Sequence, residues 1–293
     1  MIKKNSSIEV ISILSSNRSG STLLDILIGS QNGVFSSGEL KYITREGLLE
    51  EYCSCGDLIG ECELWSDIFK KWLAKSEITL EEHRKLKLRY ERIKMTFHLL
   101  FYSFYPSKDF IKYSNSLRVL LETISELSQC NTIIDSSKTP QRMLILKNIV
   151  KVKNIHLHRN PVGILNSSKK TAKIDIKKGR EYERKSNRTL PAMSSWVLTN
   201  LMIELLVIGQ QSTKVSYDEY IRDSSCLLQF NKNLDSFEGK KFNPEHILAG
   251  NRLRLKKDIQ VFDKPEDNSN LSRAQLKFAK FLGFIFPFWT SKG

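Results

Sequence analysis

Residues 15–22, SSNRSGST, combine hydroxyl side chains, one glycine and one arginine between two apolar runs. The spacing resembles the GxxxxGK[ST] pattern of a P-loop, but Ser15 stands at the first glycine and Ser21 at the lysine. Amides and hydroxyls at a helix N-terminus favour an anion, and Arg18 adds a charged fork. A capped helix beside a surface arginine is the alternative. The residues expected to hold the anion are Arg18, Ser19, Gly20, Ser21 and Thr22.

A second segment offers another place for an anion. The run KNIHLHRNPVGILNSS, residues 153–168, has the pattern of a strand, a short turn and a helix. Arg159 falls at the carboxyl end of the strand, and Ser167 lies two turns along the helix. Two side chains so placed can hold one phosphate from two directions. An arginine near a proline means little alone, but together with the first loop it indicates two anion sites in one sheet.

Short strands that alternate with longer helices must position these residues. Such alternation is typical of an α/β fold with a central parallel sheet, in which ligands bind at the carboxyl ends of the strands. The predicted strands cover residues 8–14, 131–135, 153–158 and 213–217. The predicted helices cover residues 22–30, about 80–104, 114–128, 141–150, 161 to about 171, and 191–209.

Length and composition indicate a soluble globular protein. The 293 residues are 40% hydrophobic and show no repeat or linker, so we expect one domain over residues 1–293 with a helical insertion at about 64–129. The longest weakly charged stretch, residues 190–203, stops at Glu204, short of the roughly 20 residues that span a bilayer. We therefore expect no transmembrane segment. The N-terminus has no cleavage site of a signal peptide, and we expect a cytoplasmic protein.

The charge is strongly basic and unevenly distributed. The net charge is +14, and residues 151–190 hold 12 basic and three acidic residues. Such a balance indicates anionic partners, although a charge run is often only a solvated face. A nucleic-acid-binding module is one alternative, but no nucleic-acid motif accompanies the charge, and we expect no nucleic-acid partner.

The five cysteines do not suggest a disulfide scaffold. Cys53, Cys55 and Cys62 lie in CSCGDLIGEC and could supply three zinc ligands. A fourth ligand is not evident in the sequence, so a reduced cluster that fixes a loop is the favoured interpretation.

Taken together, the motifs resemble those of the sulfotransferases that use 3'-phosphoadenosine 5'-phosphosulfate (PAPS). SSNRSGSTLL is similar to the family's 5'-phosphosulfate loop, and RNPVGILNS is similar to its 3'-phosphate motif. CSCGDLIGECELW, DSSKTPQR and HILAGNRLRL resemble segments of the family's bacterial branch. The resemblance implies a three-layer, P-loop-like fold, PAPS as co-substrate, and transfer of a sulfuryl group to a hydroxyl or, less readily, an amine.

The resemblance also implies roles for particular residues. Lys138 in DSSKTP matches the family's lysine that assists departure of the phosphate, with Arg18 beside the transferring group. Glu39 in NGVFSSGEL resembles the Gly-Glu of protein-tyrosine sulfotransferases, in which the glutamate is the base. An exposed lysine and a capping or salt-bridged glutamate are the simpler interpretations. His156 and His158 share one face of a strand and are expected to pack or hydrogen-bond.

Two departures from the family pattern affect the donor site. Val162 stands where many relatives have a second arginine. GNRLRL replaces the C-terminal RKG motif of the animal enzymes, so Asn251, Arg252 and Arg254 are expected at the donor, and which arginine contacts it stays open. The insertion is expected on the acceptor side, but it carries no motif.

An atypical P-loop kinase or nucleotide-binding protein is the main alternative. Asp135 could bind its magnesium, but Ser21 stands where the required lysine should be. The sulfotransferase interpretation requires no metal. The acceptor, whether a glycan, a glycolipid or a phenolic or tyrosyl group, and the oligomeric state stay open.

Overall fold

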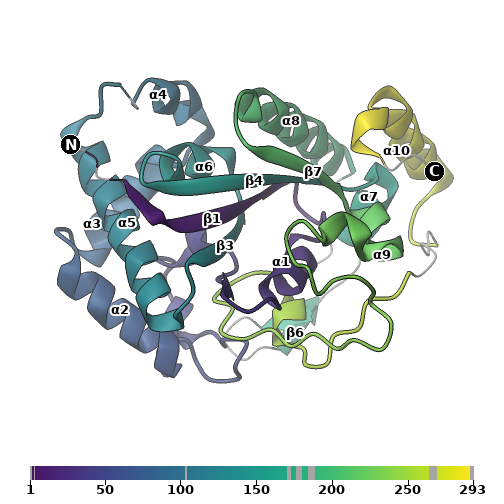
Figure 1. Ribbon diagram of the computed structural model, residues 1–293. Helices are drawn as coiled ribbons and strands as arrows, with labels where there is room; N and C mark the ends of the chain where they lie inside the picture. The colour runs from purple at the N-terminus through teal and green to yellow at the C-terminus, as the bar shows by residue number, and fades with distance from the viewer. Residues whose placement is uncertain are drawn as a thin grey trace.

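A computed structural model describes residues 2, 4–102, 104–169, 173–175, 180–183, 189–263 and 269–290. Its centre is a five-stranded sheet in which every neighbouring pair is parallel, in the order β2-β3-β1-β4-β7 (Figure 1). The α/β fold with a central parallel sheet is therefore confirmed. The strands are β1 (Asn5–Ser15), β2 (Val34–Ser36), β3 (Thr132–Lys138), β4 (Val150–His158) and β7 (Ser212–Ser216).

Helices cover both faces of the sheet, which gives the expected three layers. In β1, Val10 belongs to a core shared with α5, α6 and α8, whereas Ile11 and Ile13 belong to a core shared with α1 and α9. A strand that is buried on both faces is apolar along its length, as the sequence of β1 indicates. Figure 1 shows α6 and α8 above the sheet and α1 and α9 below it. Their bounds are α1 (Ser21–Gly29), α5 (Lys108–Ser128), α6 (Pro140–Leu146), α8 (Thr189–Val207) and α9 (Tyr217–Arg222).

The chain between β2 and β3 is helical, but not as the sequence pattern predicts. The single helix expected over residues 80–104 is two helices, because Glu91 turns inward to accept hydrogen bonds from buried Arg142 and Tyr113. The helix expected from residue 114 already begins at Lys108, where the hydroxyl of Ser107 caps it. The helices here are α2 (Glu63–Lys75), α3 (Leu80–Tyr90), α4 (Thr96–Phe101) and α5.

The helix α8 continues beyond the stretch that the sequence marks as apolar. Glu204, which interrupts that stretch, pairs with Lys214 at 2.8 Å, and the helix runs on to Val207. Among the described residues α8 alone has the length and composition to cross a membrane. Its residues Trp196 and Ile203 are buried against the rest of the fold, so α8 is part of the layer that covers the sheet.

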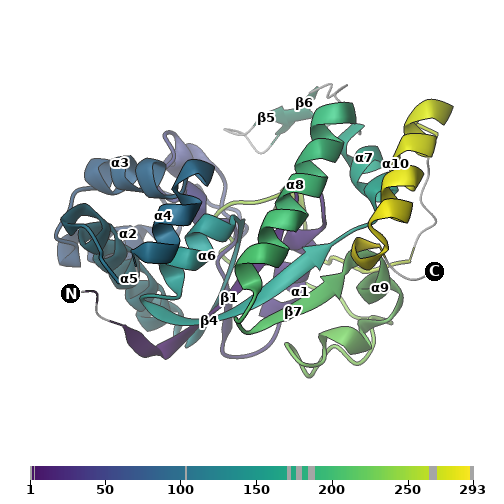
Figure 2. The ribbon, with the colours of Figure 1, turned by 90° about the horizontal axis from the view of Figure 1, so that it is seen from above.

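Two further helices and a pair of strands belong to the described chain. The helices α7 (Pro161–Lys169) and α10 (Arg273–Ile285) pack together with α8 around buried Trp196 and Trp289. The strands β5 (Lys173–Asp175) and β6 (Arg180–Glu183) form an antiparallel pair outside the main sheet. Seen from above, α8, α7 and α10 lie next to one another, from left to right (Figure 2).

Candidate functional site

The predicted site residues gather at the carboxyl edge of the sheet. The loop 16–20 follows β1, Glu39 follows β2, Lys138 ends β3, and Arg159 follows β4. Because all these strands are parallel, their carboxyl ends meet at one edge. The structure thus brings together residues that lie far apart in the sequence.

The loop after β1 reaches a left-handed backbone at two residues. Gly20, the N-cap of α1, has φ of 92°, and a Cβ there would lie 2.3 Å from the Tyr217 ring. Arg18 has φ of 69°, which is uncommon for a residue other than glycine. The hydroxyls of Ser15 and Ser16 are buried, and within the described part of the chain they have no hydrogen-bond partner. The loop therefore holds strained backbone and uncommitted polar groups, as expected of a ligand-binding loop.

The two anion motifs are joined by Arg18. Its Nε lies 3.1 Å from the Ser167 hydroxyl, and its Nη2 lies 3.1 Å from the Ser167 carbonyl oxygen. Arg159 donates to the Arg18 carbonyl oxygen at 3.4 Å, and its guanidinium lies 4.0 Å above the Tyr217 ring. Burial and the like charges of Arg159 and Arg252 lower the pKa of Arg18. Three guanidinium groups that repel one another mark a place for a multiply charged anion.

Next to this anion site, Glu39 and Lys138 form a buried ion pair. The Nζ of Lys138 lies 2.5 Å from Oε1 of Glu39, and the Nζ of Lys41 lies 3.0 Å from Oε2. Burial alone would raise the pKa of Glu39, but the charges of Lys138 and Lys41 outweigh it and lower the pKa. Burial lowers the pKa of Lys138, against the opposing charge of Glu39. Lys138 also has a left-handed backbone, with φ of 70°.

The position of Glu39 depends on a close approach of two loops. Gly38 has φ of 77°, and a Cβ there would lie 2.3 Å from the carbonyl oxygen of Ala249. The amide of Glu39 donates to that same oxygen at 2.9 Å. The glycine of the Gly-Glu pair therefore permits the contact that fixes the glutamate.

The sequence interpretation missed one acidic residue beneath the site. Asp25 lies on α1, is fully buried, and accepts a hydrogen bond of 2.7 Å from the Ser136 hydroxyl. Burial, together with the charge of Asp135, raises its pKa to about 7, although the Ser136 hydrogen bond and Lys138 oppose the shift. A lone aspartate in an apolar helix is the signal that could have identified it.

Asp135, the candidate magnesium ligand of the kinase alternative, is committed elsewhere. One of its oxygens lies 2.5 Å from Nε of Arg142, and the other accepts from the amide and hydroxyl of Ser137. Arg142 also pairs with Glu91 at 2.7 Å, so these groups form a buried network. Both oxygens of the Asp135 carboxylate are therefore engaged in this buried network.

The C-terminal motif separates its two arginines. The amide of Asn251 donates to the Thr22 hydroxyl at 3.1 Å, and the side chain of Asn251 caps the turn Arg252–Leu255. Arg254 is buried, and its Nη1 donates to the carbonyl oxygens of Tyr52 and Ile247. Arg252 is exposed, on the side where its charge acts on Arg18.

The two histidines of β4 behave as expected. His156 hydrogen-bonds to Asn200 at 2.8 Å, and His158 hydrogen-bonds to the Trp289 carbonyl oxygen at 3.1 Å. Burial lowers the pKa of His156, and it lowers the pKa of His158 to about 4. Both are neutral packing residues.

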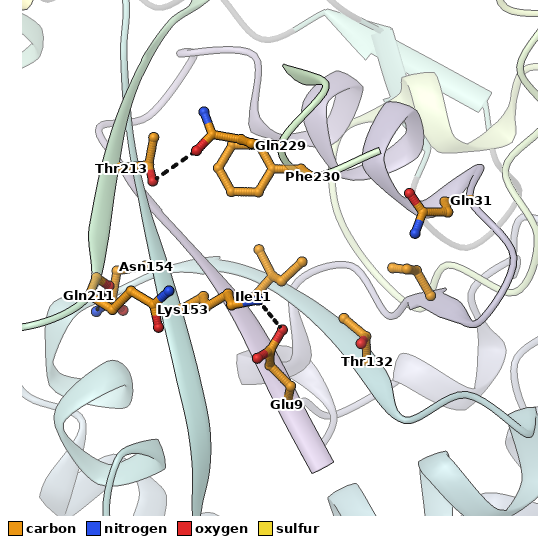
Figure 3. Close-up of a pocket in the computed structure, with 11 residues that line it drawn as sticks. Glu9, Ile11, Gln31, Thr132, Lys153, Asn154, Gln211, Thr213, Gln229 and Phe230 are labelled. Carbon is orange, nitrogen blue, oxygen red and sulfur yellow. Dashed lines mark hydrogen bonds and ion pairs between the residues drawn. The ribbon is translucent and has the colours of Figure 1, made fainter. Parts of the chain in front are cut away.

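A hollow lies away from this edge (Figure 3). It is lined at the amino-terminal halves of the strands, by Glu9 of β1, Thr132 of β3 and Thr213 of β7 among others. An ion pair of 2.9 Å between Glu9 and Lys153 crosses it. Since ligands of parallel sheets bind at the opposite ends, we assign the hollow no role.

No protein-family model matches the sequence, and no curated protein matches it significantly. Among solved structures, the chain is similar to the sulfotransferase domain from the Synechococcus PCC 7002 olefin synthase, with 19% identity and a TM-score of 0.42 over 97% of this chain and 96% of that one. It is also similar to the sulfotransferase domain from the curacin biosynthetic pathway, with 15% identity and a TM-score of 0.49 over 96% and 99%. The functional proposal therefore depends on the site's own residues.

Proposed function

We propose that the protein is a PAPS-dependent sulfotransferase that acts on a hydroxyl group. The observation that carries the proposal is the contact of Arg18 with Ser167, which joins the phosphosulfate-type loop to the 3'-phosphate-type motif. A donor with charge at both its 5' and 3' positions needs two neighbouring anion sites at the same edge of the sheet. A nucleoside triphosphate, whose charge lies in one chain of phosphates, does not need the second site.

The donor site divides between the two motifs. Arg18 and the amides and hydroxyls of Ser19 to Thr22 hold the 5'-phosphosulfate, at the N-terminus of α1. Arg159 and Ser167 hold the 3'-phosphate. Arg252 closes the site from the C-terminal loop, whereas buried Arg254 supports that loop. The charge of the donor is met by these cations, so the transfer requires no metal.

Glu39 and Lys138 carry out the transfer. The acceptor oxygen attacks sulfur, its proton passes to Glu39, and the bond from sulfur to the phosphate oxygen breaks, which releases 3'-phosphoadenosine 5'-phosphate (PAP). Lys138 stabilises the negative charge that develops on the leaving oxygen. Because Lys138 lowers the pKa of Glu39, the carboxylate is a weak base until the lysine turns to the donor. Donor binding thus strengthens the base.

The acceptor enters from the side of the helical insertion, residues 64–129, within a single domain. Two contacts support this placement, since Gln141 donates to the Thr96 hydroxyl at 2.7 Å and Arg142 pairs with Glu91. Both residues of α6 come just after Lys138, so they connect the insertion to the reacting centre. A glycan, a glycolipid or a phenolic group would suit the proposal, in a bacterial cytoplasm where the five cysteines stay reduced.

Calorimetric titration tests the donor. PAP, ATP and adenosine 5'-phosphosulfate are titrated into the wild type, Arg159→Ala and the control Arg89→Ala, because the side chain of Arg89 is exposed on α3. We expect PAP to bind most tightly, with the preference lost only in Arg159→Ala. Binding of ATP without any preference for PAP would refute the proposed sulfotransferase function and favour the kinase alternative.

A further inference from the structure

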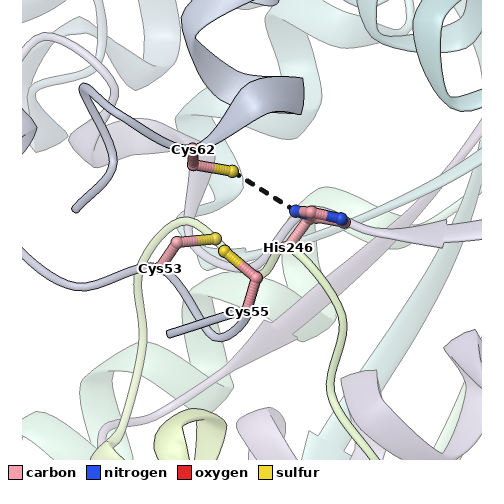
Figure 4. Close-up of side chains that lie close together, drawn as sticks. All are labelled: Cys53, Cys55, Cys62 and His246. Atoms are coloured by element: carbon pink, nitrogen blue, oxygen red, sulfur yellow. Dashed lines mark hydrogen bonds between the residues drawn. The ribbon is translucent and has the colours of Figure 1, made fainter. Parts of the chain in front are cut away.

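Four metal-binding side chains converge at a place outside the proposed donor site. Cys53, Cys55 and Cys62 come from the segment just before α2, and His246 comes from the C-terminal loop (Figure 4). Their ligand atoms all lie within 4.8 Å of one another. The sequence interpretation found three cysteines and no fourth ligand, and the fold supplies it.

We propose that these four residues bind one structural zinc ion. Zinc in structural sites is tetrahedral and takes sulfur and nitrogen ligands, and Cys₃His is one of its common sets. With bond lengths of about 2.3 Å to sulfur and 2.0 Å to nitrogen, the ligand atoms stand roughly 3.5 to 3.8 Å apart. The Sγ of Cys62 already lies 3.3 Å from Nδ1 of His246. Small adjustments of the side chains complete the tetrahedron.

The backbone around the ligands is built to hold them. The amide of Gly56 donates to the Cys53 carbonyl oxygen at 3.1 Å, and Gly56 has φ of 112°, so the chain turns tightly between the first two cysteines and Asp57. His246 has a left-handed backbone, with φ of 53°. The indole of Trp65 fixes it by donating to the His246 carbonyl oxygen at 2.6 Å.

The loops that carry the ligands are also tied together. The amide of Ile247, next to His246, donates to the Ser54 hydroxyl at 2.7 Å, between the first two cysteines. Arg254 donates to the carbonyl oxygens of Ile247 and of Tyr52, the residue before Cys53. A zinc ion with three thiolates and one imidazole has a net charge of −1, which the buried guanidinium compensates. The charge of Arg254 also acts on Glu51, so the guanidinium lies between that carboxylate and Cys53.

Metal analysis of the full chain tests the site. We expect about one zinc ion per chain after purification without chelator, and close to none in Cys55→Ser and His246→Ala. Cys130→Ser and Cys226→Ser are matched controls, because both cysteines lie outside the cluster, and they should keep the metal. Cobalt added to the reduced, metal-free wild type should give the absorption of tetrahedral thiolate coordination.

Two results would overturn the zinc site. One is a reduced wild-type protein that takes up neither zinc nor cobalt, which would show the cluster to be packing only. The other is a disulfide among the three cysteines in protein purified under reducing conditions. Metal content does not depend on sulfuryl transfer, so this test and that of the proposed function can fail separately.

A second inference comes from exposed apolar side chains on α4, α8 and α10. These helices lie on one side of the sheet, along the top of Figure 1, and the view from above shows them beside one another with α6 and α7 between them (Figure 2). The exposed apolar side chains on these helices and next to them, which we call the exposed apolar face, are Ile93, Phe97, Phe101, Phe104, Tyr105, Leu190, Leu198, Leu201, Leu205, Ile208, Phe281, Phe284, Ile285 and Phe288.

Basic residues accompany this apolar face. Residues 92–108 and 271–290 contain no acidic residue, and α8 has only Glu204, which is paired with Lys214. On α10, Lys277 lies one turn before Phe281 on the same face. The exposed basic residues beside the apolar side chains are Arg92, Lys94, Lys108, Arg273, Lys277 and Lys280.

We infer that this face docks on an anionic lipid surface, without crossing it. Exposed aromatic side chains bordered by lysine and arginine are the composition of helices that lie in a membrane interface. The charge complements anionic headgroups, whereas the same segments of a second copy of the chain would bring basic residues and no acidic residue to pair with them. The occupant that fits both the apolar and the basic side chains is therefore an anionic bilayer.

Vesicle flotation tests the lipid surface. We expect the protein to float with vesicles of phosphatidylcholine and phosphatidylglycerol, less at high salt, and not with phosphatidylcholine alone. The pairs Phe97→Ser/Phe101→Ser and Phe281→Ser/Phe284→Ser should each lower binding at least tenfold, and Leu88→Ser, an exposed leucine on α3, should not. Absence of binding to anionic vesicles, or a stable dimer that these substitutions dissociate, would refute the inference.

Discussion

The Nζ of Lys138 lies 2.5 Å from Oε1 of Glu39, across the ends of the neighbouring strands β3 and β2. Both side chains are almost fully buried, and Lys41 contacts the second carboxylate oxygen. The pair places a cation and a carboxylate side by side at the edge where the two anion motifs meet. Glu39 is thus salt-bridged, as one of the two simpler interpretations expects, and its side chain makes no capping hydrogen bond. Its role as a base stays a proposal.

Glu39→Gln should separate binding from turnover. The amide keeps the shape of the side chain and removes its ability to accept a proton, so we expect PAP affinity within about threefold and kcat lower by about 10² to 10⁴. Glu77→Gln, at an exposed position of the insertion, is the control. Sulfuryl transfer assayed with a simple phenol measures the effect. Unchanged turnover in Glu39→Gln would remove the residue from the role of base.

The buried Asp25 should make stability fall as the pH rises. Its pKa is about 7 in the folded protein against 3.8 in the unfolded chain, so between these pH values the folded state binds the extra proton. The stabilisation is fully present below pH 3.8 and is lost as the pH rises through 7. We expect the free energy of unfolding to fall by about 1 kcal/mol per pH unit in this window.

Asp25→Asn should flatten this profile, because the amide does not titrate and can still accept from Ser136. Thermal unfolding measured across the window checks it, with the exposed Asp67→Asn as control. Parallel profiles for wild type and Asp25→Asn would mean that the carboxyl does not take up a proton on folding.

The sequence predicts the sheet and its functional edge because strand, loop and helix patterns are local. It predicts neither β2, which has only three residues, nor the division of the helix expected over residues 80–104, which depends on Glu91 reaching Arg142. The fourth metal ligand was equally out of reach, since His246 is 184 residues from Cys62. Contacts of this kind exist only after the chain has folded.

The arginines show the same limit within a single motif. The sequence GNRLRL does not distinguish Arg252 from Arg254. In the folded chain Arg254 points inward and donates to the carbonyl oxygens of Tyr52 and Ile247. Asp25 resembles any acidic helix residue until its burial is known. Motif spacing therefore predicts which segments form the site, and tertiary packing decides which side chains reach it.

Arg18 should favour PAP binding through its guanidinium and lower stability through its backbone conformation. Its left-handed backbone costs roughly 1 to 2 kcal/mol for a residue with a Cβ. Arg18→Gly and Arg18→Ala both remove the guanidinium and its bonds to Ser167, so both should weaken PAP binding at least tenfold. The free energy of unfolding of the glycine variant should nevertheless exceed that of the alanine variant by about 1 kcal/mol. The glycine variant should therefore unfold at a higher temperature. Equal stability of the two variants would contradict the backbone strain.

Gly20→Ala should disrupt the loop through a steric clash. The new Cβ would lie 2.3 Å from the ring of Tyr217, in addition to the cost of φ of 92°. Gly239→Ala is a matched control, because Gly239 has φ of 68° and no atom within 4 Å of a new Cβ. We expect both variants to lose about 1 kcal/mol from backbone strain, and only Gly20→Ala to lose PAP binding as well. Calorimetry and thermal unfolding measure the two effects, and intact PAP binding in Gly20→Ala would show that the loop does not hold the donor.

Substitution of Arg252 should affect PAP binding, whereas substitution of Arg254 should affect stability. Arg252 is exposed beside Arg18, so Arg252→Gln should weaken PAP binding about tenfold and leave the unfolding temperature nearly unchanged. Arg254 is buried and donates to two carbonyl oxygens, so Arg254→Gln should lower the free energy of unfolding by about 2 to 4 kcal/mol. Arg254→Gln should lower PAP binding only because less of the protein is folded, so the titrations are corrected for the folded fraction. If Arg254→Gln weakened PAP binding in fully folded protein while Arg252→Gln did not, the assignment of the two arginines would be reversed.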